Sequence, residues 1–289
     1  MEKWPNFFIV GAPRAGTTSL YDYLNRTEGI YMSPRKEPHY FTTFGESFLY
    51  PPPIRDKKKY LELFSNVKDE KVIGEGSTSY LRDPNVPKLI QKVSPNAKII
   101  IILRDPVERA YSNYLLRVSS GKTYSFSEAV KKAIDVDFSQ YDGTIVHAGW
   151  YYKQVKGYQD VFGVDSVKIL IFEEFIKDPK KTIKEVLDFL RVDADPPESM
   201  ELVHNILTKP RGKLSTSILT NRTIRKSGRA LLPESVAEFM VRKVLGKKIT
   251  KQKMSKEDRV FLENLYSDDV LKLQKIVDKK LPWDWFNVS

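Results

Sequence analysis

The feature that most constrains the fold is a short apolar run that ends in a glycine-rich loop and passes directly into a helical pattern. The run covers residues 7–12, residues 11–18 read Gly-Ala-Pro-Arg-Ala-Gly-Thr-Thr, and Leu20, Tyr23 and Leu24 then recur at helical spacing. A strand, a tight loop and a helix in this order direct backbone N–H groups and the positive helix end at an anion. The sequence therefore predicts a phosphate or sulfate site at residues 11–18.

The strand, loop and helix unit recurs along the chain. Further strands are expected at 71–75, 98–103 and 167–172, and helices at 17–25, 84–92, from 106 onward, at 125–133, 150–162 and from 179 to 190. The run 98–103 is largely β-branched and apolar, which is typical of a strand buried on both faces of a parallel sheet. Repeated units of this kind predict an α/β protein with a P-loop-type three-layer fold, in which helices flank a central parallel sheet.

The last third of the chain has a different pattern. Residues 193–229 carry prolines at 196, 197 and 210 and many basic and hydroxyl residues, so a long loop or lid over a cofactor or substrate is expected there. Two amphipathic helices near 234–245 and 256–279 and an apolar tail at 281–286, expected to dock on the body, complete a helical part at 230–289. We expect residues 1–289 to form one domain.

Composition excludes several classes of protein. The longest apolar stretches fall far short of about 18 residues, the length that spans a bilayer, so a soluble chain is expected. No basic leader precedes the apolar run at 7–10, which predicts a cytoplasmic protein, or a soluble domain trimmed of a targeting segment. The absence of cysteine excludes disulfides and thiolate sites, and His39, His147 and His204 are too widely spaced to predict a metal cluster.

The chain carries 48 Lys and Arg against 37 Asp and Glu, a formal net charge of +11. Such a surface attracts anionic ligands or polyanions, although a solvated basic surface explains the charge equally well.

The loop at 11–18 differs from the loop of nucleotide-hydrolysing proteins, which reads G-x-x-x-x-G-K-[ST]. Here Thr17 follows Gly16, and the cation lies earlier, at Arg14. The buried strand 98–103 ends in Arg104 and not in the acidic residue that a kinase uses to hold Mg²⁺. Asp105 precedes a proline and is better explained as a helix cap than as a metal ligand. These differences predict an anion that is held by arginine without a metal.

Four motifs in one order carry a resemblance to a known family. They lie at residues 11–20, 36–41 (Lys-Glu-Pro-His-Tyr-Phe), 74–80 (Gly-Glu-Gly-Ser-Thr-Ser-Tyr) and 103–114. Together they resemble the sulfotransferases that use 3'-phosphoadenosine-5'-phosphosulfate (PAPS), and the middle pair resembles the heparan-sulfate-type branch and its bacterial relatives. The resemblance covers about residues 5–215.

The resemblance implies a donor site. In the family the first loop holds the 5'-phosphosulfate and the second motif holds the 3'-phosphate, and a basic loop in the C-terminal third closes over the 3' end. Arg14 would also stabilise charge on the bridging oxygen, since arginine does not release its proton. The positions that correspond here are Arg14, Ala15, Gly16, Thr17, Thr18 and Ser19 for the first, Arg104 and Ser112 for the second, and Arg211, Gly212 and Lys213 for the third.

Two of these assignments have simpler alternatives. Ser112 lies eight residues after Arg104, so it reaches the same anion only if the chain folds back there; otherwise it is a surface serine on a helix. The charge-rich loop at 211–213 is otherwise simply solvated.

The resemblance also implies a catalytic base. Glu37 matches the glutamate that the heparan-type enzymes use, although it would otherwise pair with Lys36 or Arg35 at the surface. His39 is the rival, because the small-molecule branch uses histidine, but it would face the opposite side if the segment is extended. Glu75 is a third candidate at a strand end. Relatives often place a lysine after that glutamate, whereas this chain has Gly76.

The sequence favours a sulfotransferase that acts on a hydroxyl or amine of an acceptor, either an anionic glycan or a small metabolite, with PAPS as donor and no metal. Two alternatives stay open: a P-loop nucleotide kinase with a drifted motif, and a non-catalytic polyanion-binding module. No specific nucleic-acid partner is expected, and the sequence predicts no oligomeric state.

Overall fold

The core of the protein is a five-stranded parallel sheet. The structure is a computed structural model, and it describes residues 2–45, 49, 51–119, 122, 124–200, 208–210, 246–248 and 254–286. The strands lie in the order β2-β3-β1-β4-β5, and each neighbouring pair is parallel. Their bounds are Phe7–Gly11 (β1), Ile30–Met32 (β2), Val72–Gly76 (β3), Lys98–Leu103 (β4) and Val167–Ile171 (β5).

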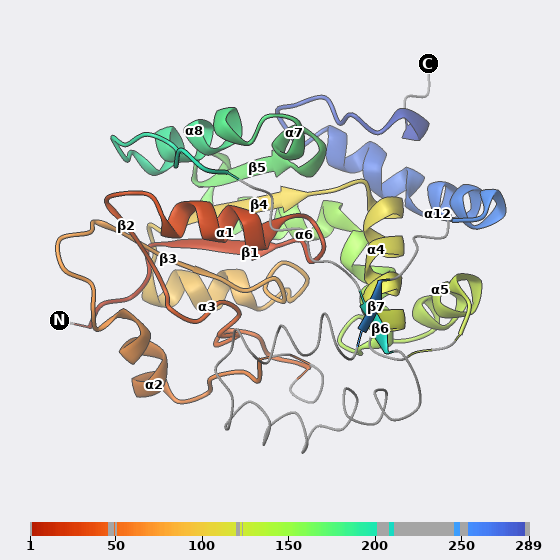
Figure 1. Cartoon of the computed structure of the whole chain (residues 1–289), viewed down its shortest axis with the longest axis horizontal. Helices are drawn as coiled ribbons and strands as arrows, with labels where there is room; N and C mark the ends of the chain where they lie inside the picture. Colours follow the sequence, from red (N-terminus) through yellow and green to blue (C-terminus); the bar gives the residue numbers. More distant parts are fainter. Residues whose placement is uncertain are drawn as a thin grey trace.

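Helices cover both faces of this sheet (Figure 1). One face carries α1 and α8, which contact each other, and the other carries α3 and α6, with α12 packed against α6 and α4. The predicted three-layer α/β fold is therefore confirmed. The helices are Thr17–Asn25 (α1), Lys57–Leu61 (α2), Val86–Val93 (α3), Pro106–Ser119 (α4), Phe126–Ile134 (α5), Tyr151–Phe162 (α6), Phe172–Lys177 (α7), Pro179–Leu190 (α8) and Lys256–Gln274 (α12).

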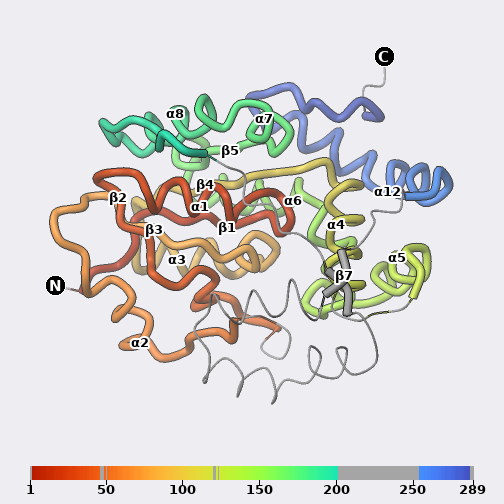
Figure 2. Tube along the Cα trace, in the orientation of Figure 1, coloured from red at the N-terminus to blue at the C-terminus, as the bar shows by residue number. Residues whose placement is uncertain are grey.

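The central strands are almost completely buried. Residues 99–103 of β4 are all 0% exposed, as expected for an isoleucine-rich strand between β1 and β5 that is covered on both faces. The apolar tail at 281–286 docks on the body as predicted, with Leu281 and Trp283 buried, and it passes beside α7 (Figure 2). No helix in the described part of the chain is long and apolar enough to cross a membrane.

Some predicted boundaries were wrong. Helix α12 ends at Gln274 and not at 279, since a short irregular segment leads from there into the tail. The short elements β2, α2 and α7 were not predicted. Within the segment expected to be a loop, Thr208–Pro210 (β6) pairs antiparallel with Gly246–Lys248 (β7). The rest of 201–229 and the helix expected at 234–245 lie outside the described residues.

Because all five strands of the sheet are parallel, their carboxyl ends meet at one edge. The glycine loop follows β1, Glu37 follows β2, Thr78 follows β3 and Arg104 follows β4. Ligands of open α/β sheets bind at this edge, which therefore contains the candidate site.

Candidate active site

The glycine loop leaves the start of α1 open to an anion. Gly16 is the N-cap, with a φ of 87°, and no side chain caps the helix or places an acid in its first turn. A Cβ at Gly16 would lie 3.0 Å from a ring carbon of Phe172, so this position needs glycine for both its conformation and its space. The first N–H groups of a helix have no intrahelical partner and carry its positive end. Around them Ala15, Thr17 and Ser19 are buried, and Thr18 is half-buried.

Arg14 connects the loop to the second motif. Its Nε donates to the Ser112 hydroxyl at 3.1 Å, and the Nη1 of Arg104 donates to the Arg14 carbonyl at 3.1 Å. The chain does not fold back at Ser112, because α4 is continuous from 106 to 119, and Arg14 reaches Ser112 on this helix. The structure thus brings Arg14, Arg104 and Ser112 together from β1, β4 and α4.

Positive charge accumulates at this junction. Burial, followed by the charges of Arg104 and Arg109, lowers the pKa of Arg14 to about 10, and burial also lowers the pKa of Arg104. The Nε of Arg104 is buried and has no hydrogen-bond partner among the described residues. The carboxylates of Glu173, Glu108 and Asp105 partly offset this effect at Arg104, but no carboxylate does so at Arg14, whose buried charge a bound anion would stabilise. The donor set of guanidinium, hydroxyl and helix N–H groups therefore fits phosphate and sulfate oxygens.

Asp105 has the capping role that the sequence indicated. Its Oδ1 accepts from the N–H groups of Val107 at 2.8 Å and Glu108 at 3.3 Å, and its Oδ2 accepts from Trp285 Nε1 at 3.0 Å. Burial raises the pKa of Asp105 to about 6. Both oxygens are used to fix the β4–α4 junction, which carries Arg104.

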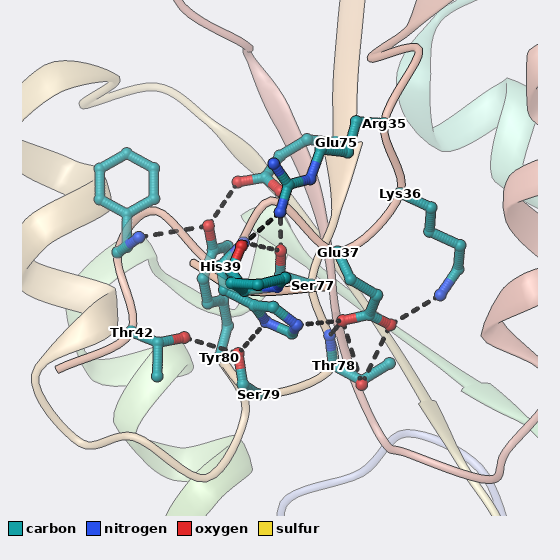
Figure 3. A network of polar contacts seen from close by, with 12 residues as sticks. Arg35, Lys36, Glu37, His39, Thr42, Glu75, Ser77, Thr78, Ser79 and Tyr80 are labelled. Atoms are coloured by element: carbon teal, nitrogen blue, oxygen red, sulfur yellow. Dashed lines mark hydrogen bonds and ion pairs between the residues drawn. The ribbon is translucent and has the colours of Figure 1, made fainter. Parts of the chain in front are cut away.

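Glu37 is held at the end of β3 by a dense set of donors (Figure 3). Its Oε1 accepts from Lys36 Nζ at 2.7 Å and from the Thr78 hydroxyl at 3.1 Å, and its Oε2 accepts from the Thr78 N–H at 2.8 Å. The backbone N–H of Glu37 donates to the Gly76 carbonyl at 2.9 Å. The Nε2 atom of His39 lies 3.6 Å from Oε2. The Glu37 side chain as a whole is 16% exposed.

The electrostatics separate the roles of Glu37 and His39. Burial acts to raise the pKa of Glu37, but the charges of Lys36 and His39 and the hydrogen bonds from Lys36 and Thr78 hold it below its ordinary value. Burial lowers the pKa of His39 to about 4, so its imidazole is neutral near pH 7. The pKa of Glu37 is therefore lowered mainly by Lys36 and Thr78. The imidazole is 3% exposed, and its Nδ1 is 2.7 Å from the Ser79 hydroxyl. Glu37 is ionised and its side chain is partly exposed, whereas His39 is neutral and almost completely buried.

His39 was expected to face away from Glu37 only if the segment is extended. The segment is not extended, because Glu37 and His39 have φ values of 60° and 54°. These left-handed conformations return the two side chains to one side.

Glu75, the third candidate base, is fully buried. Its Oε1 accepts from the hydroxyls of Tyr60 at 3.0 Å and Tyr80 at 2.7 Å, and its Oε2 accepts from Ser77 at 3.0 Å. Burial raises the pKa of Glu75 to about 7. Because no part of it is exposed, an acceptor cannot reach it.

The basic loop predicted at 211–213 cannot be compared with the structure. Arg211, Gly212 and Lys213 lie outside the described residues, as does His204. Strand β6, which ends just before Arg211, lies against α4.

Sequence reasoning did not assign a role to Thr78, whose N–H and hydroxyl both donate to Glu37. Its position inside the motif at 74–80 was the signal that could have identified it.

The fold and the loop define an α/β protein with a candidate anion site at the strand ends. A sequence profile of the family described as "Sulfotransferase domain" matches residues 5–277, and the chain belongs to this family. The predicted family is thus confirmed.

Individual proteins of the family show how far the similarity extends. The chain is 31% identical over 246 residues to carbohydrate sulfotransferase 15 of Homo sapiens, with 65% of this chain and 44% of that protein covered. It is 26% identical to the human heparan sulfate glucosamine 3-O-sulfotransferase 3B1, with 65% and 46% covered. The chain therefore spans about half the length of these curated relatives.

Solved structures agree in fold. A sulfotransferase from Alicyclobacillus acidocaldarius superposes with a TM-score of 0.74 at 31% identity, with 98% of this chain and 99% of that chain covered. A mouse sulfotransferase complexed with PAP superposes with a TM-score of 0.52 at 16% identity, with 92% and 84% covered, and at this identity it shows the fold alone.

Proposed function

We propose that this chain transfers a sulfuryl group from PAPS to a hydroxyl or amine of an acceptor, a glycan or a small metabolite, with Glu37 as general base. The observation that carries the proposal is the joining of Arg14, Ser112 and Arg104 at the open end of α1. It is a cationic site for phosphate and sulfate oxygens on a sheet edge that also carries an ionised carboxylate. Membership of the sulfotransferase family and the PAP complex of a protein of the same fold support PAPS as the donor.

The residues of the site divide into a donor side and an acceptor side. PAPS, when bound, supplies a sulfuryl group on a phosphate oxygen. The loop from Arg14 to Ser19 holds the 5' end and Arg104 and Ser112 hold the 3'-phosphate. Arg14 and the N-terminus of α1 stabilise the negative charge that develops on the phosphate oxygen as its bond to sulfur breaks.

Glu37 accepts the proton of the acceptor hydroxyl while that oxygen bonds to sulfur. The hydrogen bonds from Lys36 and Thr78 fix the carboxylate in place, and His39 packs beside it in the neutral form. The proton thus passes to Glu37, the sulfuryl group passes to the acceptor oxygen, and the negative charge stays on the leaving phosphate. No metal takes part in this scheme. That the reaction needs no metal stays a prediction from the sequence.

Three cations surround the acceptor side. Arg35, Lys36 and Arg55 each act to lower the pKa of His39, which places their charges near the base. This charge suits an anionic acceptor, and relatives named for carbohydrate and heparan sulfate substrates favour a glycan over a small metabolite.

The family profile, which spans 5–277, supports the proposal that residues 1–289 form a single sulfotransferase domain. The basic loop at 211–213 is proposed to close over the 3' end of the donor. The cytoplasmic location stays a prediction from the sequence.

Calorimetry separates donor classes. We expect PAP to bind without a metal and ATP with Mg²⁺ to bind weakly. Tight ATP binding that requires Mg²⁺ would instead indicate a kinase. Mass spectrometry of pooled glycans, lipids and metabolites incubated with PAPS should then reveal an acceptor that gains one sulfuryl group.

The substitution Glu37→Gln tests the base. Turnover should fall by about 10²- to 10⁴-fold, the usual contribution of a general base, with PAP affinity unchanged. Glu62→Gln, at an exposed glutamate, is the matched control and should retain full turnover. If Glu37→Gln stays active and His39→Ala does not, histidine is the base.

A further inference from the structure

Residues 37–41, which carry the candidate base, have a backbone that local sequence does not favour. Neither Glu37 nor His39 is glycine, yet both have φ in the left-handed region. Non-glycine residues adopt this conformation rarely, and they keep it only where their surroundings hold them. Contacts from outside the segment must therefore fix it.

Besides the bonds of Glu37 with Gly76 and Thr78, two hydroxyl bridges make such contacts, and both lead to one carboxylate (Figure 3). The His39 N–H donates to the Ser77 hydroxyl at 3.0 Å, which donates to Glu75 Oε2 at 3.0 Å. The Phe41 N–H donates to the Tyr80 hydroxyl at 3.3 Å, which donates to Glu75 Oε1 at 2.7 Å. Alternate N–H groups of the segment are thus tied to the two oxygens of Glu75.

The direction of every bond follows from the carboxylate. A backbone N–H only donates, so each hydroxyl must accept from it and must turn its own single proton elsewhere. An ionised carboxylate only accepts, and Glu75 receives both protons. A glutamine would present an N–H to one of the two hydroxyls and would break that arrangement. Because Ser77, Tyr80 and Glu75 are fully buried, water cannot substitute.

We propose that Glu75 is a positioning residue which, through the hydroxyls of Ser77 and Tyr80, holds residues 37–41 in the conformation that presents Glu37 to the acceptor. The inference rests on the proposed function, since it assigns the base to Glu37. Glu75 itself touches neither donor nor acceptor.

Tyr60 provides a matched control. Its hydroxyl donates to the same Oε1 of Glu75 at 3.0 Å and is equally buried, but in the described part of the chain it makes no hydrogen bond to residues 37–41. Tyr60→Phe and Tyr80→Phe each remove one hydroxyl from Glu75, and only the second removes a bridge. Ser77→Ala removes the other bridge.

The experiment measures kcat, the KM for PAPS, the Kd for PAP and thermal unfolding of these three variants at about pH 8, where Glu75 is ionised. Tyr80→Phe and Ser77→Ala should lower kcat by about 10- to 100-fold, since a displacement of about 1 Å has such effects, with KM and Kd within about twofold. Glu75→Gln should behave in the same way. Tyr60→Phe should keep kcat within about twofold, although it lowers thermal stability similarly.

Equal loss of kcat in Tyr60→Phe and Tyr80→Phe, or full kcat in both bridge variants, would overturn the proposal. So would loss of PAP binding along with turnover, because the bridges would then support the whole fold. Glu37→Gln, assayed in parallel, separates the two ideas. If it retains activity, the assignment of the base fails. If it loses activity while both bridge variants keep theirs, only the role of Glu75 fails.

Discussion

Replacing Arg14 by methionine should stabilise the ligand-free protein while weakening donor binding. In the absence of an anion, Arg14 is a largely buried cation whose neighbours include Arg104 and Arg109. Methionine keeps a long unbranched side chain and the same left-handed backbone, with φ at 70° in the parent, but removes the charge. The substitution therefore isolates the cost of holding that charge in the empty site.

The magnitude follows from the pKa. Burial and the two neighbouring arginines lower the pKa of Arg14 from its ordinary value to about 10, which corresponds to about 3 kcal/mol of destabilisation. Because both values lie well above pH 7.5, Arg14 is charged in the folded and unfolded states and the whole cost is present there. Loss of the hydrogen bond to Ser112 removes about 1 kcal/mol, which leaves a net stabilisation of about 2 kcal/mol.

Urea unfolding at about pH 7.5, with and without PAP, measures both effects. The variant should unfold at higher urea than the parent when PAP is absent. Its affinity for PAP should be lower by about 10- to 150-fold, the equivalent of about 1.5–3 kcal/mol for a charged hydrogen bond. Arg191→Met is the control, because Arg191 is exposed and also left-handed, with φ at 58°. A less stable ligand-free Arg14→Met protein, or one that PAP stabilises as fully as the parent, would refute the reasoning.

Two further substitutions test the electrostatics. Lys36→Met removes a charge that opposes the effect of burial on Glu37, so the pKa of Glu37 should rise and the acid limb of kcat should move to higher pH; an unchanged pH profile would contradict this. Trp285→Phe removes a donor to Asp105, whose pKa burial raises to about 6. The cost in urea unfolding should be about 1.5–3 kcal/mol at about pH 8 and should fall toward about 1 kcal/mol at about pH 5, where Asp105 is protonated. An equal cost at both pH values would exclude the charged hydrogen bond.

The sheet and most helices could be predicted because their signals are local. The continuous apolar run at 98–103 and the helical spacing at 17–25 match the observed bounds of β4 and α1. The Asp-Pro pairs marked the starts of α4 and α8 because caps act within one turn. The three-residue strand β2 is too short to show any period, and packing on β3 determines it.

The candidate site was predicted in its residues and not in its geometry. The motifs at 11–18, 36–41 and 74–80 contain the residues that meet at the strand ends. The partners of Glu37, however, depend on contacts across 41 positions of sequence, as in its hydrogen bonds with Thr78. No periodic pattern encodes such a pairing, because either residue alone is compatible with many surroundings.

The position of His39 shows which physical information the sequence lacked. Alternation along a strand follows from extended backbone angles, and it fails where tertiary contacts force φ above zero. The N–H of Glu37 bonds to Gly76, the last residue of β3, and the N–H of His39 bonds to Ser77, the first residue after it. Two consecutive residues at the end of β3 thus fix the backbone at two positions of another segment. The next two residues supply Thr78 to the carboxylate and Ser79 to the imidazole. Glu37 and His39 thus share one side because residues 76–79 bind both their backbone and their side chains. These four residues therefore determine the geometry around the proposed base, although none of them is proposed to transfer a proton.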